Sequence, residues 1–163
     1  MNVSVIISTY NRPHYLKRVI DAYLHQTSIP QEIVVADDGS TEDTAFMLQE
    51  NYKNSSVPII HVWHEDKGFR AAKIRNRAIA SASGEYIILC YDDSMPSMFM
   101  IQDHIKYAEN GYFIQGHRVL LGRNISNHIT FKDICLSGIL KLMISRQAGN
   151  VLNTLRFPTA FIR

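Results

Sequence analysis

An alternation between β-branched runs and stretches with helical periodicity is the feature that most constrains this chain. Residues 3–9 read VSVIIST, an almost continuous apolar run that is typical of a strand covered on both faces. Three comparable runs occupy residues 32–40, 59–64 and 85–91, and each interval between runs is long enough for a helix. Strands joined by such helices form a parallel sheet with right-handed crossovers. The sequence therefore predicts an α/β, Rossmann-like, doubly wound and mostly parallel sheet with helices on both faces.

The expected helices lie between and after these strands. Residues 14–26 carry an apolar stripe that we expect to face the sheet, formed by Tyr15, Val19, Ala22 and Tyr23. After the fourth strand the alternation loses regularity. In order along the chain, the remaining expected elements are helices at residues 41–52 and within 65–83, a helix at 96–111, a strand at 112–122 and a helix at 131–146.

Length and composition limit the chain to one domain of an ordinary globular type. It has 163 residues, of which 46% are hydrophobic and 20% charged, and its net charge of +2 is too weak to indicate a nucleic-acid partner. We find no secretory signal and no apolar stretch of the roughly 20 residues that span a bilayer. Cys90 and Cys135 are far apart and fit reduced core thiols. We therefore expect a cytoplasmic protein, with the inner face of a membrane as an alternative location.

Polar and charged residues gather where the expected strands end. Residues 9–12 read TYNR, residues 37–40 read DDGS, residues 66–68 read DKG, and Asp92 and Asp93 follow the fourth strand. Ligands of doubly wound sheets bind beyond the carboxyl ends of the strands. We therefore expect these four segments to line one site.

Adjacent carboxylates such as Asp92 and Asp93 are commonplace in solvated turns, and this alternative stays open. Their position after a fully apolar strand, a second pair at Asp37 and Asp38, and a cationic segment nearby favour a binding role. The cations of this segment are Lys67, Arg70, Lys73, Arg75 and Arg77, of which Arg77 fits a solvated helix face better than a binding role and Lys73 fits either. Carboxylates beside cations suit Mg²⁺ or Mn²⁺ together with a phosphate group, because a hard divalent ion bridges oxygen ligands of both.

The segments VSVIISTYNR, EIVVADDGST and EDKGFRAAKIRNRAIASASGEYIIL, the last of which leads to the acidic pair, resemble the family 2 glycosyltransferases of the GT-A fold. The resemblance extends from Val3 to about Leu121. It implies a single GT-A-like domain over residues 1–163, with a nucleotide-sugar-binding part at 1–121 and the start of a truncated acceptor half at 122–163. It also implies a UDP-sugar donor and a glycan or lipid-linked acceptor.

The resemblance assigns roles to individual residues. Asp37 or Asp38 would accept a hydrogen bond from the uracil imide N–H, and Asp93 would bind Mn²⁺ or Mg²⁺. Asp92 would meet the ribose or a water molecule. The other residues expected around the nucleotide-sugar are Thr9, Tyr10 and Arg12 in the nucleoside pocket, with Lys67, Arg70, Lys73 and Arg75 toward the base or the pyrophosphate.

Two features depart from the family pattern. The family's Asp-X-Asp metal motif is replaced by Tyr91, Asp92 and Asp93, so that the acids are adjacent. The catalytic base, which the family carries well downstream of this motif, is not identified, because the acids after residue 100 read as surface residues.

The leading hypothesis is a metal-dependent glycosyltransferase that moves a hexose from a UDP-sugar, with inversion, to a glycan or lipid-linked acceptor. The alternative is a catalytically incomplete binding module, with the apolar residues 134–144 as a contact for a protein partner or a membrane surface. A dinucleotide-dependent enzyme is disfavoured because STYNRP, rather than a Gly-x-Gly-x-x-Gly motif, follows the first strand.

Overall fold

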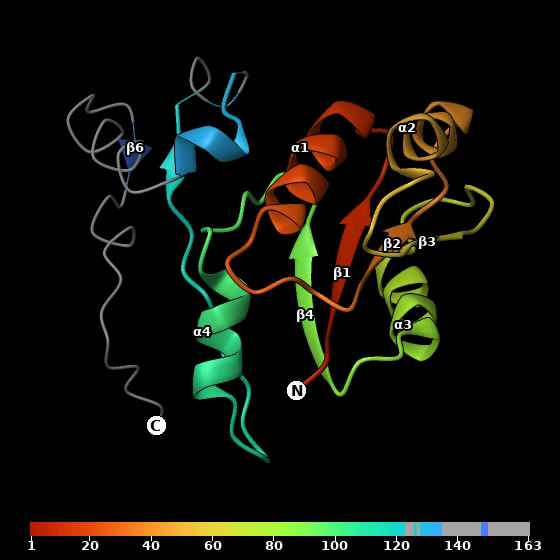
Figure 1. Cartoon of the computed structure of the whole chain (residues 1–163). Coiled ribbons are helices and arrows are strands. Elements are labelled where there is room, and N and C mark those ends of the chain that lie inside the picture. The colour runs from red at the N-terminus through yellow and green to blue at the C-terminus, as the bar shows by residue number, and fades with distance from the viewer. Residues whose placement is uncertain (123–125, 127, 135–147, 150–163) are drawn as a thin grey trace.

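In the computed structural model, four parallel strands form one sheet in the order β3-β2-β1-β4. The structure describes residues 1–122, 126, 128–134 and 148–149. In Figure 1 the arrows of β1 and β4 point toward the same edge of the sheet. The predicted parallel sheet is confirmed, and its strands are β1 (Val3–Thr9), β2 (Glu32–Asp37), β3 (Ile59–Trp63) and β4 (Tyr86–Tyr91).

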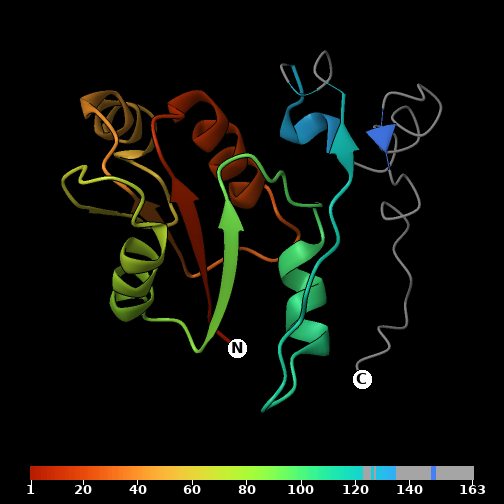
Figure 2. The ribbon, with the colours of Figure 1, turned by 180° about the vertical axis from the view of Figure 1, so that it is seen from behind.

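Helices cover both faces of this sheet, as predicted (Figures 1 and 2). One face packs against three helices. Leu48 and Ile101, which lie on two of these helices, belong to the same hydrophobic core as Val5. The opposite face packs against α3, whose Ile74 and Ala78 share a second core with β1 and β2. The helices are α1 (Pro13–Leu24), α2 (Glu42–Tyr52) and α4 (Met100–Tyr107) on the first face and α3 (Ala71–Ser81) on the second.

The two central strands explain the continuous apolar runs. Every residue of β1 and of β2 is buried, because each strand has neighbours on both edges and helices on both faces. In the parallel register Thr9 lies opposite Asp37, and Ser8 lies opposite Tyr91. The segments that follow β2 and β4 therefore flank the end of β1.

The predicted stripe of α1 is wrong at one position. Tyr15 is 38% exposed, whereas Leu16 and Ile20 are fully buried. Residues on one helix face recur at intervals of three and four, which places residues 16, 19, 20 and 23 together and leaves residue 15 beside them. The other three predicted residues, Val19, Ala22 and Tyr23, are buried as expected.

The expected strand at residues 112–122 is much shorter in the structure. Only β5 (Leu120–Leu121) is a strand, and it pairs antiparallel with β6 (Ala148–Gly149). Phe113 is 82% exposed, so the apolar residues of this segment are not buried as those of a core strand would be. The apolar pattern alone was therefore a misleading signal here.

The helix expected at residues 131–146 falls mostly outside the described residues. Its first residues form a 3₁₀ helix, η1 (Phe131–Ile134). Cys135 and all but the first residue of the apolar segment 134–144 also lie outside the described part. None of the helices that the structure describes is long and apolar enough to cross a bilayer.

Candidate functional site

Thr9, the last residue of β1, connects the two acidic pairs. Its carbonyl oxygen accepts a hydrogen bond from the backbone N–H of Asp38 at 3.0 Å. Its hydroxyl donates to Asp92, with an Oγ1–Oδ2 distance of 2.7 Å. The carboxyl ends of β2 and β4 are thereby tied to the same residue, and the predicted convergence of the strand ends is present.

The acidic pair after β4 is divided between interior and surface. Asp92 is buried, and its backbone N–H donates to the carbonyl of Ser8 at 3.1 Å. Burial raises the pKa of the Asp92 carboxyl, and the Thr9 hydrogen bond and the Arg12 charge oppose that rise. The Asp93 side chain is half exposed, and its Oδ2 lies 3.4 Å from Nη1 of Arg12. One carboxylate is therefore held in place and the other faces solvent.

The side chain of Asp37, the last residue of β2, is buried and uses both of its oxygens in contacts within the protein. Its Oδ2 lies 2.9 Å from Nε2 of His61, and its Oδ1 accepts the backbone N–H of Ser40 at 2.8 Å. Burial raises the pKa of the Asp37 carboxyl, but these hydrogen bonds outweigh burial and leave the pKa below its ordinary value. Both oxygens are therefore used to cap the turn after β2 and to bind β3.

Asp38 stands one residue farther out and is also buried. Its Oδ1 lies 2.7 Å from Nε2 of His64, and its Oδ2 accepts the backbone N–H of Arg70 at 2.9 Å. Nδ1 of His64 is buried and has no hydrogen-bond partner among the described residues, so the contact of this ring with Asp38 is made through Nε2. The carboxylate of Asp38 is thus held in one orientation by β3 and the start of α3.

The histidines that hold these two aspartates were not singled out by the sequence. The available signal was their position, since β3 pairs with β2 in parallel and places His61 and His64 beside the end of β2. That pairing follows from the sheet order, which spacing along the chain does not provide.

The turn after β1 is pinned to the turn after β2. Asn11 has a φ of +52°, a left-handed conformation that asparagine tolerates better than most residues. Its backbone N–H donates to Oγ of Ser40 at 2.8 Å, and its Oδ1 accepts the N–H of Thr41 at 2.9 Å. Pro13 then begins α1, so Arg12 leaves the turn with its backbone held on both sides.

The loop between β3 and α3 closes over the same edge. The Tyr10 hydroxyl donates to Oδ2 of Asp66 at 2.8 Å, and this hydrogen bond raises the pKa of Tyr10 and lowers that of Asp66. Gly39 has a φ of +100°, and a Cβ at this position would lie 2.7 Å from Cα of Asp66. Only glycine therefore allows the loop to pack directly on the turn after β2.

The predicted cations lie at several places around this edge. Arg70 is at the start of α3, where its side chain donates to the carbonyl of Glu65. Arg75 lies on the face covered by α3, with Nε 3.3 Å from Oγ of Ser8 and its guanidinium over the ring of Tyr91. The two lysines are exposed, and of these Lys67 pairs with Glu65 at 2.8 Å whereas Lys73 lies on the outer side of α3.

The acidic pair after β4 fits part of a divalent-cation site. Mn²⁺ and Mg²⁺ prefer oxygen ligands, and Asp92 and Asp93 present two neighbouring carboxylates at the edge of the sheet. The described residues contain no group of three or more acidic, histidine or cysteine side chains placed to hold a metal ion. The remaining ligands would have to come from water and from phosphate oxygens, which is a common arrangement for Mg²⁺.

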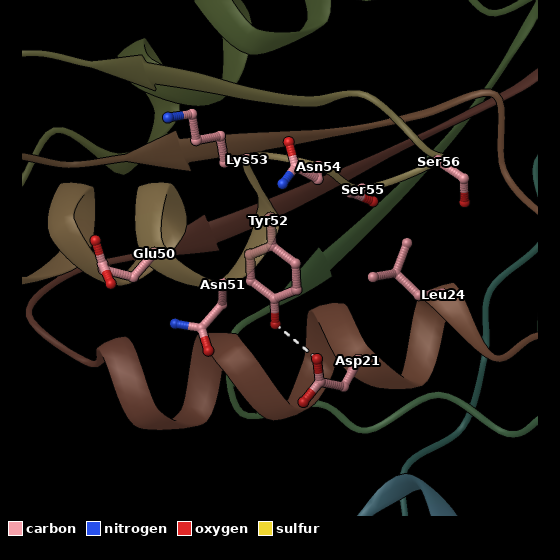
Figure 3. Close-up of a pocket in the computed structure, with 9 residues that line it drawn as sticks. All are labelled: Asp21, Leu24, Glu50, Asn51, Tyr52, Lys53, Asn54, Ser55 and Ser56. Carbon is pink, nitrogen blue, oxygen red and sulfur yellow. Dashed lines mark hydrogen bonds between the residues drawn. The ribbon is translucent and has the colours of Figure 1, made fainter.

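A separate hollow of about 420 Å³ lies between the later turns of α1 and α2 (Figure 3). In it the hydroxyl of Tyr52 donates to Oδ1 of Asp21 at 2.7 Å, and Glu50 and Lys53 are among its lining residues. Crossover helices run antiparallel to the strands, so this hollow lies toward the amino ends of the strands. None of the predicted site residues lines it.

Comparison with known proteins settles the family. Residues 4–150 match the family described as Glycosyl transferase family 2. The chain belongs to this family. Among its relatives is the glycosyltransferase GlyG of Streptococcus pneumoniae serotype 4, which is 29% identical over 163 aligned residues. That alignment covers 91% of this chain and 50% of GlyG, so the family 2 chain spans about half the length of this relative.

Two solved structures share the fold of this chain. TarS of S. aureus, in a crystal structure with UDP-GlcNAc, matches with a TM-score of 0.55 and 25% identity over 71% of this chain and 37% of that chain. The mannosyltransferase PcManGT of Pyrobaculum calidifontis, in complex with GDP-Man and Mn²⁺, matches with a TM-score of 0.55 and 25% identity over 67% of this chain and 33% of that chain. The GT-A-like architecture expected from the sequence is therefore confirmed.

Proposed function

We propose that this chain forms the nucleotide-sugar-binding part of a glycosyltransferase that takes a UDP-sugar as donor. The observation that supports this is the pair of acidic turns at the ends of β2 and β4, joined through Thr9. The complexes of TarS with UDP-GlcNAc and of PcManGT with GDP-Man and Mn²⁺ support a nucleotide-sugar donor and a divalent cation. The acceptor is a hydroxyl of a glycan or of a lipid-linked acceptor.

Asp38 is the better candidate for recognition of the base. Both oxygens of Asp37 are used within the protein, and its side chain is 1% exposed. Asp38 lies nearer the edge, and His64 and the N–H of Arg70 fix its orientation, so its remaining lone pairs can accept the imide N–H of uracil. Tyr10 and Arg70 frame the same position from the ends of β1 and the β3–α3 loop.

Asp93 is the candidate metal ligand, because it is the exposed member of its pair. When bound, Mn²⁺ or Mg²⁺ would act as a Lewis acid that neutralises the charge developing on the departing diphosphate. Asp92, held by Thr9, orients the turn that carries Asp93 and lies within reach of the ribose or a water molecule. Transfer then requires a base that removes the acceptor proton in a single inverting displacement, and no described residue is assigned to that role.

Calorimetric titration with UDP, with and without Mn²⁺, tests this proposal. D38N removes the charge from the proposed imide contact and is expected to weaken UDP binding about tenfold or more. D93N is expected to abolish the gain that Mn²⁺ provides. E50Q, an exposed acid of α2 beside the hollow of Figure 3, is the control and should bind as the wild type does. Unchanged UDP affinity in D38N, or equal losses in E50Q, would refute the assignment.

A second candidate is a binding module that needs further polypeptide for transfer. The observation that favours it is that the chain spans only 50% of GlyG and about a third of each solved neighbour. A transfer assay against a panel of glycan and lipid-linked acceptors separates the two functions. UDP binding without turnover on any acceptor supports the module, and turnover supports the enzyme.

A further inference from the structure

Arg12 occupies the position that a metal ion would compete for. Its Nη1 lies 3.4 Å from Oδ2 of Asp93 and 3.9 Å from Oδ1 of Asp92, so one nitrogen faces one oxygen of each carboxylate. The other Asp92 oxygen accepts the hydroxyl of Thr9. Oδ1 of Asp93 accepts the hydroxyl of Ser94 at 3.3 Å, which leaves the two oxygens that face Arg12 as the ones that a cation at this edge would meet.

The backbone of Arg12 is held in place by its neighbours, whereas more than half of its side chain is exposed to solvent. Asn11 is bound to the turn after β2 through Ser40 and Thr41, and Pro13 begins α1. The Arg12 side chain, in contrast, is 55% exposed. A guanidinium displaced from the acidic pair would therefore stay within reach of it, because the backbone of Arg12 is held in place.

The ion pair is of a kind that a divalent cation can displace. Arginine binds carboxylates most strongly when two of its N–H groups meet two oxygens of one carboxylate, and Arg12 does not make such a bidentate contact here. Exposed ion pairs with a single contact contribute little free energy. Two adjacent carboxylates nevertheless repel each other, so the pair has some stabilising effect when no other cation is bound.

We propose that Arg12 is a built-in competitor for the divalent cation at Asp93, beside Asp92, so that it weakens metal binding until a diphosphate is present. This inference rests on the proposed function, because it assumes that Asp93 binds the metal. A donor diphosphate offers the displaced guanidinium another anionic partner, since guanidinium groups bind phosphate oxygens well. Metal and nucleotide then bind with positive coupling, and each raises the affinity for the other.

A different role for Arg12 predicts the opposite result. If Arg12 only supports the fold of the acidic turn, its removal should loosen Asp92 and Asp93 and weaken metal binding. If it is only a solvated surface residue, its removal should change nothing. The direction of the change in metal affinity therefore distinguishes competition from both of these roles.

Titration of the protein with Mn²⁺, followed by the electron paramagnetic resonance signal of free Mn²⁺ at low ionic strength, tests the inference. R12Q is expected to bind Mn²⁺ about two- to fivefold more tightly than the wild type, the range expected for loss of an exposed ion pair. R12K keeps the charge and should stay near the wild type. R77Q removes an exposed arginine from α3, on the other face of the sheet, and controls for net charge.

A UDP arm completes the experiment. Addition of UDP should raise Mn²⁺ affinity less in R12Q than in the wild type, after correction for the complex of Mn²⁺ with free UDP. Thermal unfolding verifies that R12Q is folded, and R12A provides the same measurement if it is not. Equal or weaker Mn²⁺ binding in R12Q, with binding still dependent on Asp93, overturns this inference alone. No Mn²⁺ binding in any variant, even with UDP, overturns the proposed metal site as well.

Discussion

The hydroxyl of Thr9 and the carboxylate of Asp92 form a 2.7 Å hydrogen bond between the ends of two paired strands. The same Thr9 accepts the N–H of Asp38 from the strand on its other side. A single residue thus sets the spacing between the proposed base contact and the proposed metal contact. Substitutions at this junction are expected to affect the fold and the ligand together.

Substitution of Thr9 tests this junction. T9V keeps the shape of the side chain and removes the donor, which leaves the buried Asp92 oxygen without this partner. We expect a loss of about 1–3 kcal/mol in the free energy of unfolding, measured by urea denaturation, and weaker UDP binding. T9S keeps the hydroxyl and should lose less stability and less UDP affinity than T9V. Equal stability of T9V and wild type would show that the hydrogen bond is energetically unimportant.

Gly39 and Gly111 form a matched pair for a backbone prediction. Both have positive φ, but only at Gly39 would a Cβ meet another segment, the backbone of Asp66 at 2.7 Å. G111A should cost about 1–2 kcal/mol, the penalty for a left-handed alanine. G39A should cost more and should also weaken UDP binding, because it pushes the β3–α3 loop away from Asp38. Similar losses in both variants, by urea denaturation, would contradict the close packing seen at Gly39.

Asp37 and Asp92 should respond to pH in opposite directions. The pKa of Asp37 is lowered in the folded chain, so its stabilising effect is present above the pKa of an unfolded aspartate and is lost as the pH falls through the folded value. D37N should therefore lose about 1.5–3 kcal/mol at about pH 7 and approach the wild type in acid. Urea denaturation across the acidic range measures this convergence.

The pKa of Asp92 is raised by burial, which reverses the sign. The protonated carboxyl of Asp92 favours folding below the pKa of an unfolded aspartate. This contribution is lost as the pH rises through the pKa that Asp92 has in the folded chain, where the buried side chain must ionise. D92N should therefore be more stable than the wild type at about pH 7, with the difference closing in acid, while UDP and Mn²⁺ binding are lost. A D92N variant that is less stable at neutral pH would show that the charge of Asp92 supports the fold.

Cys90 should be an unreactive thiol in the folded protein. Burial raises its pKa to about 12, so very little thiolate is present at neutral pH. In a C135S background, which leaves Cys90 as the single cysteine, alkylation by iodoacetamide should be very slow until urea unfolds the chain. Alkylation of the native protein at the rate of a free thiol would contradict the raised pKa of this partly buried side chain.

The two central strands, β1 and β2, could be predicted because every one of their residues is buried and most are apolar. Residues 3–9 are all buried, and the apolar run states this directly. The segment that contains Phe113 has a similar composition, yet Phe113 is 82% exposed, because composition does not reveal whether a neighbouring layer exists. Local sequence predicts an element well when the tertiary environment agrees with it and poorly when that environment is missing.

The candidate site shows the same division. The acids at the strand ends were predictable, because the carboxyl edge of a parallel sheet collects them. The difference between Asp37 and Asp38 was not predictable, since it depends on His61 of β3 and on His64 just after that strand. The contact of Arg12 with Asp92 and Asp93 joins residues about eighty positions apart and likewise requires the folded chain.

The order β2-β1-β4 fixes the distance between the ends of β2 and β4. Neighbouring strands are separated by a nearly invariant hydrogen-bonding distance, so the ends of β2 and β4 stand two such steps apart, about 9.5 Å. Side-chain substitutions can change which ligand groups are bound at each strand end, but they cannot change the distance between the two ends. In proteins with this strand order, sequence changes should therefore alter which sugar is bound more easily than they alter the length of the nucleoside diphosphate that carries the sugar.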